Sequence, residues 1–86
     1  GAAFLHGEDM LLTLKEYALL LLLVQNEGKT LAKQAIYAKV WGRPLGGDSQ
    51  ALYTVVSRLK KKLEPAGKSV RLTAQRPGGY RLTIEP

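Results

Sequence analysis

The side chains suited to binding a ligand gather on one face of the segment from Gly47 to Pro65. On a helix with ~100° per residue, the opposite face is an apolar stripe roughly 100° wide, as a globular helix presents to its core. The stripe consists of Leu52, Val55, Val56, Leu59 and Leu63. The other positions carry amide, hydroxyl, phenol and cationic groups, namely Gln50, Tyr53, Thr54, Ser57, Arg58, Lys60 and Lys61. This layout predicts a recognition helix that hydrogen-bonds to a partner outside the domain.

Both ends of this helix carry boundary signals. Asp48 or Ser49 can cap its start, because a short side-chain oxygen accepts a hydrogen bond from the free amides of the first turn. Pro65 ends it, since proline has no amide hydrogen and disfavours helical geometry in the residue before it. We therefore expect the helix at about residues 48–64, with a loop at 65–69.

The composition argues against an enzyme and against a metal site. The chain has no cysteine and one histidine, His6, which leaves no thiol chemistry, no disulfide and few ligands for a transition metal. No glycine-rich phosphate loop follows a strand, because Gly78 and Gly79 lie in a predicted hairpin turn. We expect neither enzymatic activity nor a cofactor or metal.

The net charge of +6 is confined to one half of the chain. Residues 1–42 contain four basic and four acidic side chains, whereas residues 43–86 contain nine basic and three acidic ones. A one-sided basic surface suits a polyanion, most often nucleic acid. The alternative is a basic face that serves solubility alone.

The length of 86 residues predicts a single domain. We assign residues 1–3 to a cloning remnant and residues 4–86 to the domain. The apolar run at 19–24 is too short to cross a membrane, which needs ~18 residues, and it lacks the flanks of a signal peptide. We expect a soluble, cytoplasmic protein without membrane contact.

A first helix begins after Thr13, which has capping-box spacing to Glu16. Every residue from Tyr17 to Val24 is apolar, so we expect this helix to be covered on both sides. Gly28 follows as a left-handed cap. Before the helix, residues 4–6 and 10–12 are short apolar runs around a turn composition at 7–9, which predicts a small hairpin or an edge strand.

A second helix is predicted from Lys33 to Trp41, ended by Gly42 and started poorly by Ala32, which has no capping oxygen. Residues 70–75 and 80–84 then alternate between apolar and polar side chains around a turn at 76–79. This pattern predicts a β-hairpin with one apolar face. Three helices followed by a hairpin make an α+β fold of the winged helix-turn-helix type, here with a curtailed N-terminal β-element.

Residues 10–84 resemble the DNA-binding effector domain of OmpR/PhoB-type two-component response regulators. No single motif decides this, but six occur in the right order and spacing. They are Leu12-Thr13-Leu14-Lys15-Glu16-Tyr17, Gly28, Val40-Trp41-Gly42, Gly47-Asp48-Ser49, the run 56–64 beginning Val56-Ser57-Arg58, and Arg76-Pro77-Gly78-Gly79-Tyr80-Arg81-Leu82.

The resemblance implies a bacterial-type transcription regulator of a phosphorelay that binds double-stranded DNA as a dimer. The third helix would enter the major groove, the wing at 76–79 would approach the minor groove, and the 42–47 loop would contact RNA polymerase. By position, Arg58 matches a base-reading arginine, Trp41 and Lys60 match phosphate contacts, and Arg76 matches the wing arginine. Packing in the core is an equally good interpretation of Trp41. Lys62 lies on the flank of the buried side, where solvation is its simplest role.

The chain departs from the family at several phosphate-binding positions. Many members carry Arg, Thr, Asp, His and Arg where this chain has Gln50, Ala51, Tyr53, Val55 and Ser57, and Gly where it has Pro77. Because salt dependence scales with the phosphates neutralised, we expect weaker and less salt-dependent binding than in a typical member. These losses also keep open a second hypothesis, a winged helix that contacts RNA polymerase or a regulator partner and has weak DNA affinity.

Overall fold

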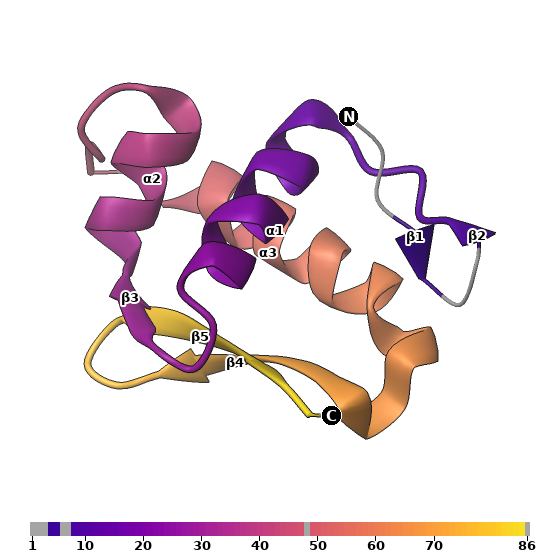
Figure 1. Cartoon of the computed structure of the whole chain (residues 1–86). Helices are drawn as coiled ribbons and strands as arrows, with labels where there is room; N and C mark the ends of the chain where they lie inside the picture. Colours follow the sequence, from indigo (N-terminus) through magenta and orange to yellow (C-terminus); the bar gives the residue numbers. More distant parts are fainter. Residues whose placement is uncertain (1–3, 6–7, 48, 86) are drawn as a thin grey trace.

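The computed structural model describes residues 4–5, 8–47 and 49–85 and consists of a helical layer packed on a small antiparallel sheet (Figure 1). The predicted fold is confirmed: three helices are followed by a β-hairpin. The elements are β1 (Phe4–Leu5), β2 (Glu8–Asp9), α1 (Leu14–Gln25), β3 (Thr30–Ala32), α2 (Lys33–Trp41), α3 (Gln50–Lys62), the 3-10 helix η1 (Glu64–Ser69), β4 (Val70–Gln75) and β5 (Gly79–Ile84).

The sheet has one strand more than the sequence pattern predicts. Strands β4 and β5 pair antiparallel, with Leu72 opposite Leu82, as the alternation predicts. Strand β3 adds to the other edge of β5, which gives the order β3-β5-β4. Three residues are too few to show a period of two, so only the tertiary pairing reveals this strand. It ties the start of α2 to the wing.

The core lies between the helices and the sheet. Its fully buried side chains come from all three helices and from β5, namely Leu19, Leu23, Ile36, Leu52, Leu59 and Leu82. The apolar stripe predicted for α3 is buried as expected, with Val55 partly buried and the other four members buried. One face of α3 is therefore committed to the interior.

Helix α1 is covered on one side only, so the expectation of cover on both sides is wrong. Leu14 is 86% exposed, Leu21 46% and Val24 44%. The helix packs against α2, α3 and β5. The side chains of Leu14, Leu21 and Val24 lie on the opposite side of its axis. The uninterrupted apolar run hid this difference, because it has no polar residue to mark the outer face.

The N-terminal hairpin exists, but its second strand is Glu8–Asp9 instead of the apolar run 10–12. Strand β2 ends where the Asp9 carboxylate accepts a hydrogen bond from the amide of Leu11 at 2.9 Å. Leu11 then takes the left-handed conformation, with φ of 55°, and leads into the Thr13–Glu16 capping box, which is present as predicted. The assignment of residues 1–3 lies outside the described residues.

The ends of α3 differ from the prediction. Ser49 stands at the N-cap position but makes no capping hydrogen bond with its side chain, because its backbone (φ −95°, ψ 7°) is not in the extended conformation that capping requires. The alternative cap, Asp48, lies outside the described residues. Helix α3 ends at Lys62, and Pro65 belongs to η1 instead of the predicted loop. Of the two predicted glycine caps, Gly42 is confirmed as the left-handed C-cap of α2, with φ of 73°. Gly28 is left-handed, with φ of 82°, but it does not cap α1, because the C-cap of that helix is Asn26.

No helix among the described residues is both long enough and apolar enough to span a bilayer.

Gly79 allows β5 to approach β3 closely. A β-carbon at this position would overlap the carbonyl oxygen of Leu31 and press on the Thr30 side chain. We therefore expect Gly79→Ala to destabilise the domain by about 2 kcal/mol, as backbone shifts of this kind typically do. Urea denaturation measures the change. Gly46→Ala is the control, because open space surrounds Gly46 and its substitution should stay within about 0.5 kcal/mol. Equal effects of the two substitutions would contradict this account.

Candidate nucleic-acid interface

The outer face of α3 forms one open hollow lined by five of the predicted binding residues. They are Gln50, Tyr53, Thr54, Ser57 and Arg58. All lie within residues 50–58 of a single helix whose other face is buried in the core. The structure thus brings these five side chains together as the helical periodicity predicts.

Two of the hollow's side chains have defined surroundings. The Thr54 hydroxyl donates its proton to the carbonyl oxygen of Gln50 at 2.9 Å, which leaves its oxygen free to act as an acceptor. Burial raises the pKa of Tyr80 on β5, and the nearby Tyr53 raises it further. Tyr53 is therefore close enough to Tyr80 for the charge on one phenol to affect the other.

The remaining cations of α3 lie outside this hollow. Lys60 is exposed and lines a separate groove between the end of α3 and β4, together with Leu63, Val70 and Arg71. Lys61 is also exposed. The predicted binding set is accordingly divided between a polar hollow and a cationic end of the helix.

Trp41 is held by aromatic and cationic contacts. Its ring stacks on Tyr37 with centroids 4.5 Å apart and planes 5° from parallel. The Lys15 ammonium lies 5.3 Å from the Trp41 centroid and donates to the Val40 carbonyl oxygen. The half-buried Trp41 also packs against the core, so its packing role is confirmed and its phosphate contact stays a prediction.

Arg76 lies in the turn between β4 and β5, apart from the α3 hollow. It lines a second hollow together with Gly78 of the same turn and with Lys33 at the start of α2. The sequence pattern did not single out Lys33, because Lys33 lies beside the wing only as a result of the pairing of β3 with β5.

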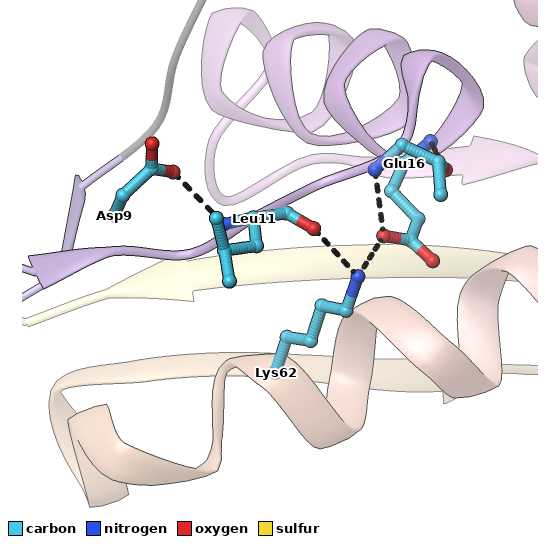
Figure 2. Close-up of polar contacts among 5 residues, drawn as sticks. Asp9, Leu11, Glu16 and Lys62 are labelled. Carbon is cyan, nitrogen blue, oxygen red and sulfur yellow. Dashed lines mark hydrogen bonds and ion pairs between the residues drawn. The ribbon is translucent and has the colours of Figure 1, made fainter.

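A partly buried ion pair fixes α3 against α1 and against residues 10–13, the N-terminal arm that leads into α1 (Figure 2). Glu16 is 1% exposed, and its Oε1 accepts hydrogen bonds from the Lys62 ammonium at 2.5 Å and from the Thr13 amide at 3.0 Å. Lys62 also donates to the carbonyl oxygen of Leu11 at 3.0 Å. The interpretation of Lys62 as merely solvated is therefore wrong. Its partner is 46 residues away, and no local pattern marks the pair.

The charge state of Glu16 follows from these contacts. Burial acts to raise the pKa of its carboxyl group, but the hydrogen bonds from Lys62 and Thr13 and the positive charges of Lys62 and Arg58 outweigh it. The net effect lowers the pKa. Glu16 is thus ionised at neutral pH and links the recognition helix to the rest of the domain.

Among residues 4–5, 8–47 and 49–85, no three His, Cys, Asp or Glu side chains gather as metal ligands would.

The chain matches a protein family over residues 7–82, and the description of that family is "Transcriptional regulatory protein, C terminal". The regulatory protein VanRB of Enterococcus faecalis is 40% identical over 77 residues, which are 88% of this chain and 33% of the relative. The transcriptional activator protein IrlR of Burkholderia pseudomallei is 33% identical over 79 residues, which are 92% of this chain and 34% of the relative. The chain therefore spans about a third of the length of these relatives.

Solved structures have the same fold. The DNA-binding domain of Bacillus subtilis CssR superposes with a TM-score of 0.74 at 30% identity, covering 90% of this chain and 83% of that one. The DNA-binding domain of the response regulator AdeR, solved in complex with an intercistronic region, gives a TM-score of 0.80 at 25% identity. That match covers 98% of this chain and 86% of the other.

The buried pair should make stability depend on pH. Because the pKa of Glu16 is lowered on folding, its stabilisation is complete above the unfolded-state pKa of about 4.3 and is lost as pH falls through the folded-state pKa. We expect Glu16→Gln to cost about 2 kcal/mol at pH 7, since one partner of a buried, partly solvated pair remains, and clearly less at pH 3.

Urea denaturation at both pH values measures this difference. Glu85→Gln is the control, because Glu85 and Arg71 pair at 2.7 Å with about half of each side chain exposed. Its substitution should change stability by at most about 0.5 kcal/mol. A Glu16→Gln cost that is the same at pH 3 and pH 7 would sink the pH argument.

Proposed function

Because the chain belongs to the family of C-terminal domains of transcriptional regulatory proteins, we propose that it is the DNA-binding effector part of a two-component response regulator. In this proposal α3 enters the major groove of double-stranded DNA and the wing at 76–79 approaches the minor groove. The observation that carries it is the α3 hollow, in which five polar side chains face outward from a helix anchored on its other side. The AdeR domain, which has the same fold, was solved with DNA.

The dimensions and chemistry of α3 suit this role. Its 13 residues make a rod about 20 Å long, and the major groove of B-DNA admits an α-helix. The exposed guanidinium of Arg58 can bond both acceptors on the edge of a guanine. Thr54 offers an acceptor, since its proton is engaged, and Tyr53 offers an aromatic face for a sugar or a thymine methyl group. These side chains would supply the sequence specificity.

The cations Lys60 and Lys61 on α3 and the indole of Trp41 would contact phosphates and position the helix without reading bases. Neutral groups at Gln50, Tyr53 and Ser57 leave few such contacts on the outer face of α3. Affinity and its salt dependence should therefore be lower than in relatives with basic residues there.

The wider assignments follow from the family. We propose a cytoplasmic regulator without enzymatic activity that binds DNA as a dimer and uses its 42–47 loop to contact RNA polymerase. The exposed apolar side of α1 favours a second candidate, a protein-interaction module, because leucine side chains gain nothing from contact with phosphates. The two roles are compatible, since the α1 side and the α3 hollow are different surfaces.

The test begins with selection of bound sequences from a random duplex pool, followed by titration of a selected duplex at two salt concentrations. Arg58→Ala should raise Kd by at least about fivefold and relax the preference at one base pair, since a bidentate contact is worth about 1–3 kcal/mol. Arg58→Lys keeps the positive charge but loses the paired donors of the guanidinium. The affinity for random DNA should therefore persist, while the preference for the selected base pair is lost.

Arg76→Ala should weaken binding of the same duplex through the minor-groove contact. The control is Lys68→Ala in η1, which lies at the opposite end of the molecule from the wing turn (Figure 1). If neither arginine substitution weakens binding, this surface does not bind DNA and the protein-interaction candidate takes its place.

A further inference from the structure

A cationic hollow, separate from the α3 hollow, lies between the wing turn and the start of α2. The family motifs include its wing residues but not Lys33. The hollow is lined by Thr30, Lys33, Gln34, Arg76 and Gly78, among others. Its two walls come from segments more than 40 residues apart in the sequence. They are joined because the amide of Lys33 donates to the carbonyl oxygen of Gly78 at 3.2 Å and Ala32 pairs with Gly79.

Backbone contacts between β3, β5 and the start of α2 hold this junction together. Strand β5 can lie so close to β3 only because Gly79 has no side chain. The backbone bond to Gly78 then holds the first residue of α2 against the turn that carries Arg76. Lys33 and Arg76 are therefore parts of one surface, with their relative position set by backbone contacts.

The hollow has no acidic lining residue. Among the described residues, the two ion pairs join Lys62 to Glu16 and Arg71 to Glu85, and neither involves Lys33 or Arg76. The positive charges of Lys33 and Arg76 thus have no acidic side chain beside them in the hollow, which suits an anion placed between its two walls. The Thr30 hydroxyl and the Gln34 amide, which line the same hollow, add neutral hydrogen-bond donors suited to a phosphate.

The side chain of Lys33 is directed along the wing. A β-carbon built on Gly78 would lie 3.8 Å from Lys33 Cε, at ordinary van der Waals distance. The aliphatic stem of Lys33 thus runs past the turn that carries Arg76.

We propose that Lys33 binds one backbone phosphate of the DNA strand bordering the minor groove and thereby positions the wing so that Arg76 can enter the groove. This inference rests on the proposed function and extends it. The interface would include the start of α2 as well as α3 and the wing, and Lys33 would replace part of the phosphate contact that the neutral residues of α3 lack. Lys33 is a positioning residue in this account, since a phosphate contact carries no base information.

Salt dependence tests the proposal. Lys33→Met keeps an unbranched apolar stem beside Gly78 and removes only the charge. With the selected duplex, the slope of log K against log salt should become shallower by about 0.9, the value for one phosphate on B-DNA. The same relation predicts about a fivefold higher Kd at 0.15 M salt and about a fifteenfold higher Kd at 0.05 M. Preference between the selected and a scrambled duplex should stay as in the parent chain.

Two matched variants isolate the contact. Lys33→Arg keeps the charge and should restore the parental slope, whereas Lys68→Met removes an exposed lysine at the far end of the molecule and should leave the slope unchanged. Urea denaturation of Lys33→Met should match the parent chain, because the change touches no core residue.

The inference is overturned if Lys33→Met leaves the slope unchanged while Arg58→Ala still weakens binding, or if Lys68→Met alters the slope as much as Lys33→Met does. If neither Arg58→Ala nor Lys33→Met weakens DNA binding, the result contradicts the proposed function itself.

Discussion

The carboxylate of Glu16 is the constraint on which the rest of the structure depends. It is buried and ionised, and it would be costly in that position without its partners. Those partners come from three separate segments: the Thr13 amide at the start of α1, the Lys62 ammonium at the end of α3 and, through Lys62, the Leu11 carbonyl of the N-terminal arm. One buried charge therefore aligns the arm, the first helix and the recognition helix (Figure 2).

This alignment separates the two faces of α3. Leu52, Val56 and Leu59 are buried between α1 and the sheet, so the helix cannot rotate without exposing them. The outward hollow is thus presented in a fixed orientation, as a surface that reads a rigid duplex requires. The close approach of β5 to β3 at Gly79 likewise fixes the orientation of the wing. Both surfaces are carried by elements that pack on the same core.

Regular periodicity made most of this architecture predictable. The stripe of α3 and the alternation of the hairpin each repeat over several residues, and the Thr13–Glu16 capping box is a local motif. What could not be predicted depends on partners distant in the chain. Strand β3 is too short for a pattern, and the partner of Lys62 is 46 residues away. The exposed side of α1 was hidden because burial depends on neighbours, and leucines such as Leu14 and Leu21 look identical on either side.

The candidate site also has one part that local periodicity predicts and one part that depends on partners distant in the chain. Five members of the predicted set share one hollow because they share one helix face, whereas the neighbourhood of Lys33 and Arg76 arises from strand pairing. Trp41 shows the limit of positional matching. Its contacts with Tyr37 and Lys15 account for its burial without any ligand.

The most direct test of this account is a residue-by-residue map of the surface that contacts DNA, obtained from amide chemical shifts during titration with a selected duplex. The account predicts the largest changes along α3 from Gln50 to Lys61, in the turn at 76–78 and at Lys33, with the exposed side of α1 around Leu21 unaffected. Changes confined to α1, with the α3 hollow and the wing silent, would contradict it.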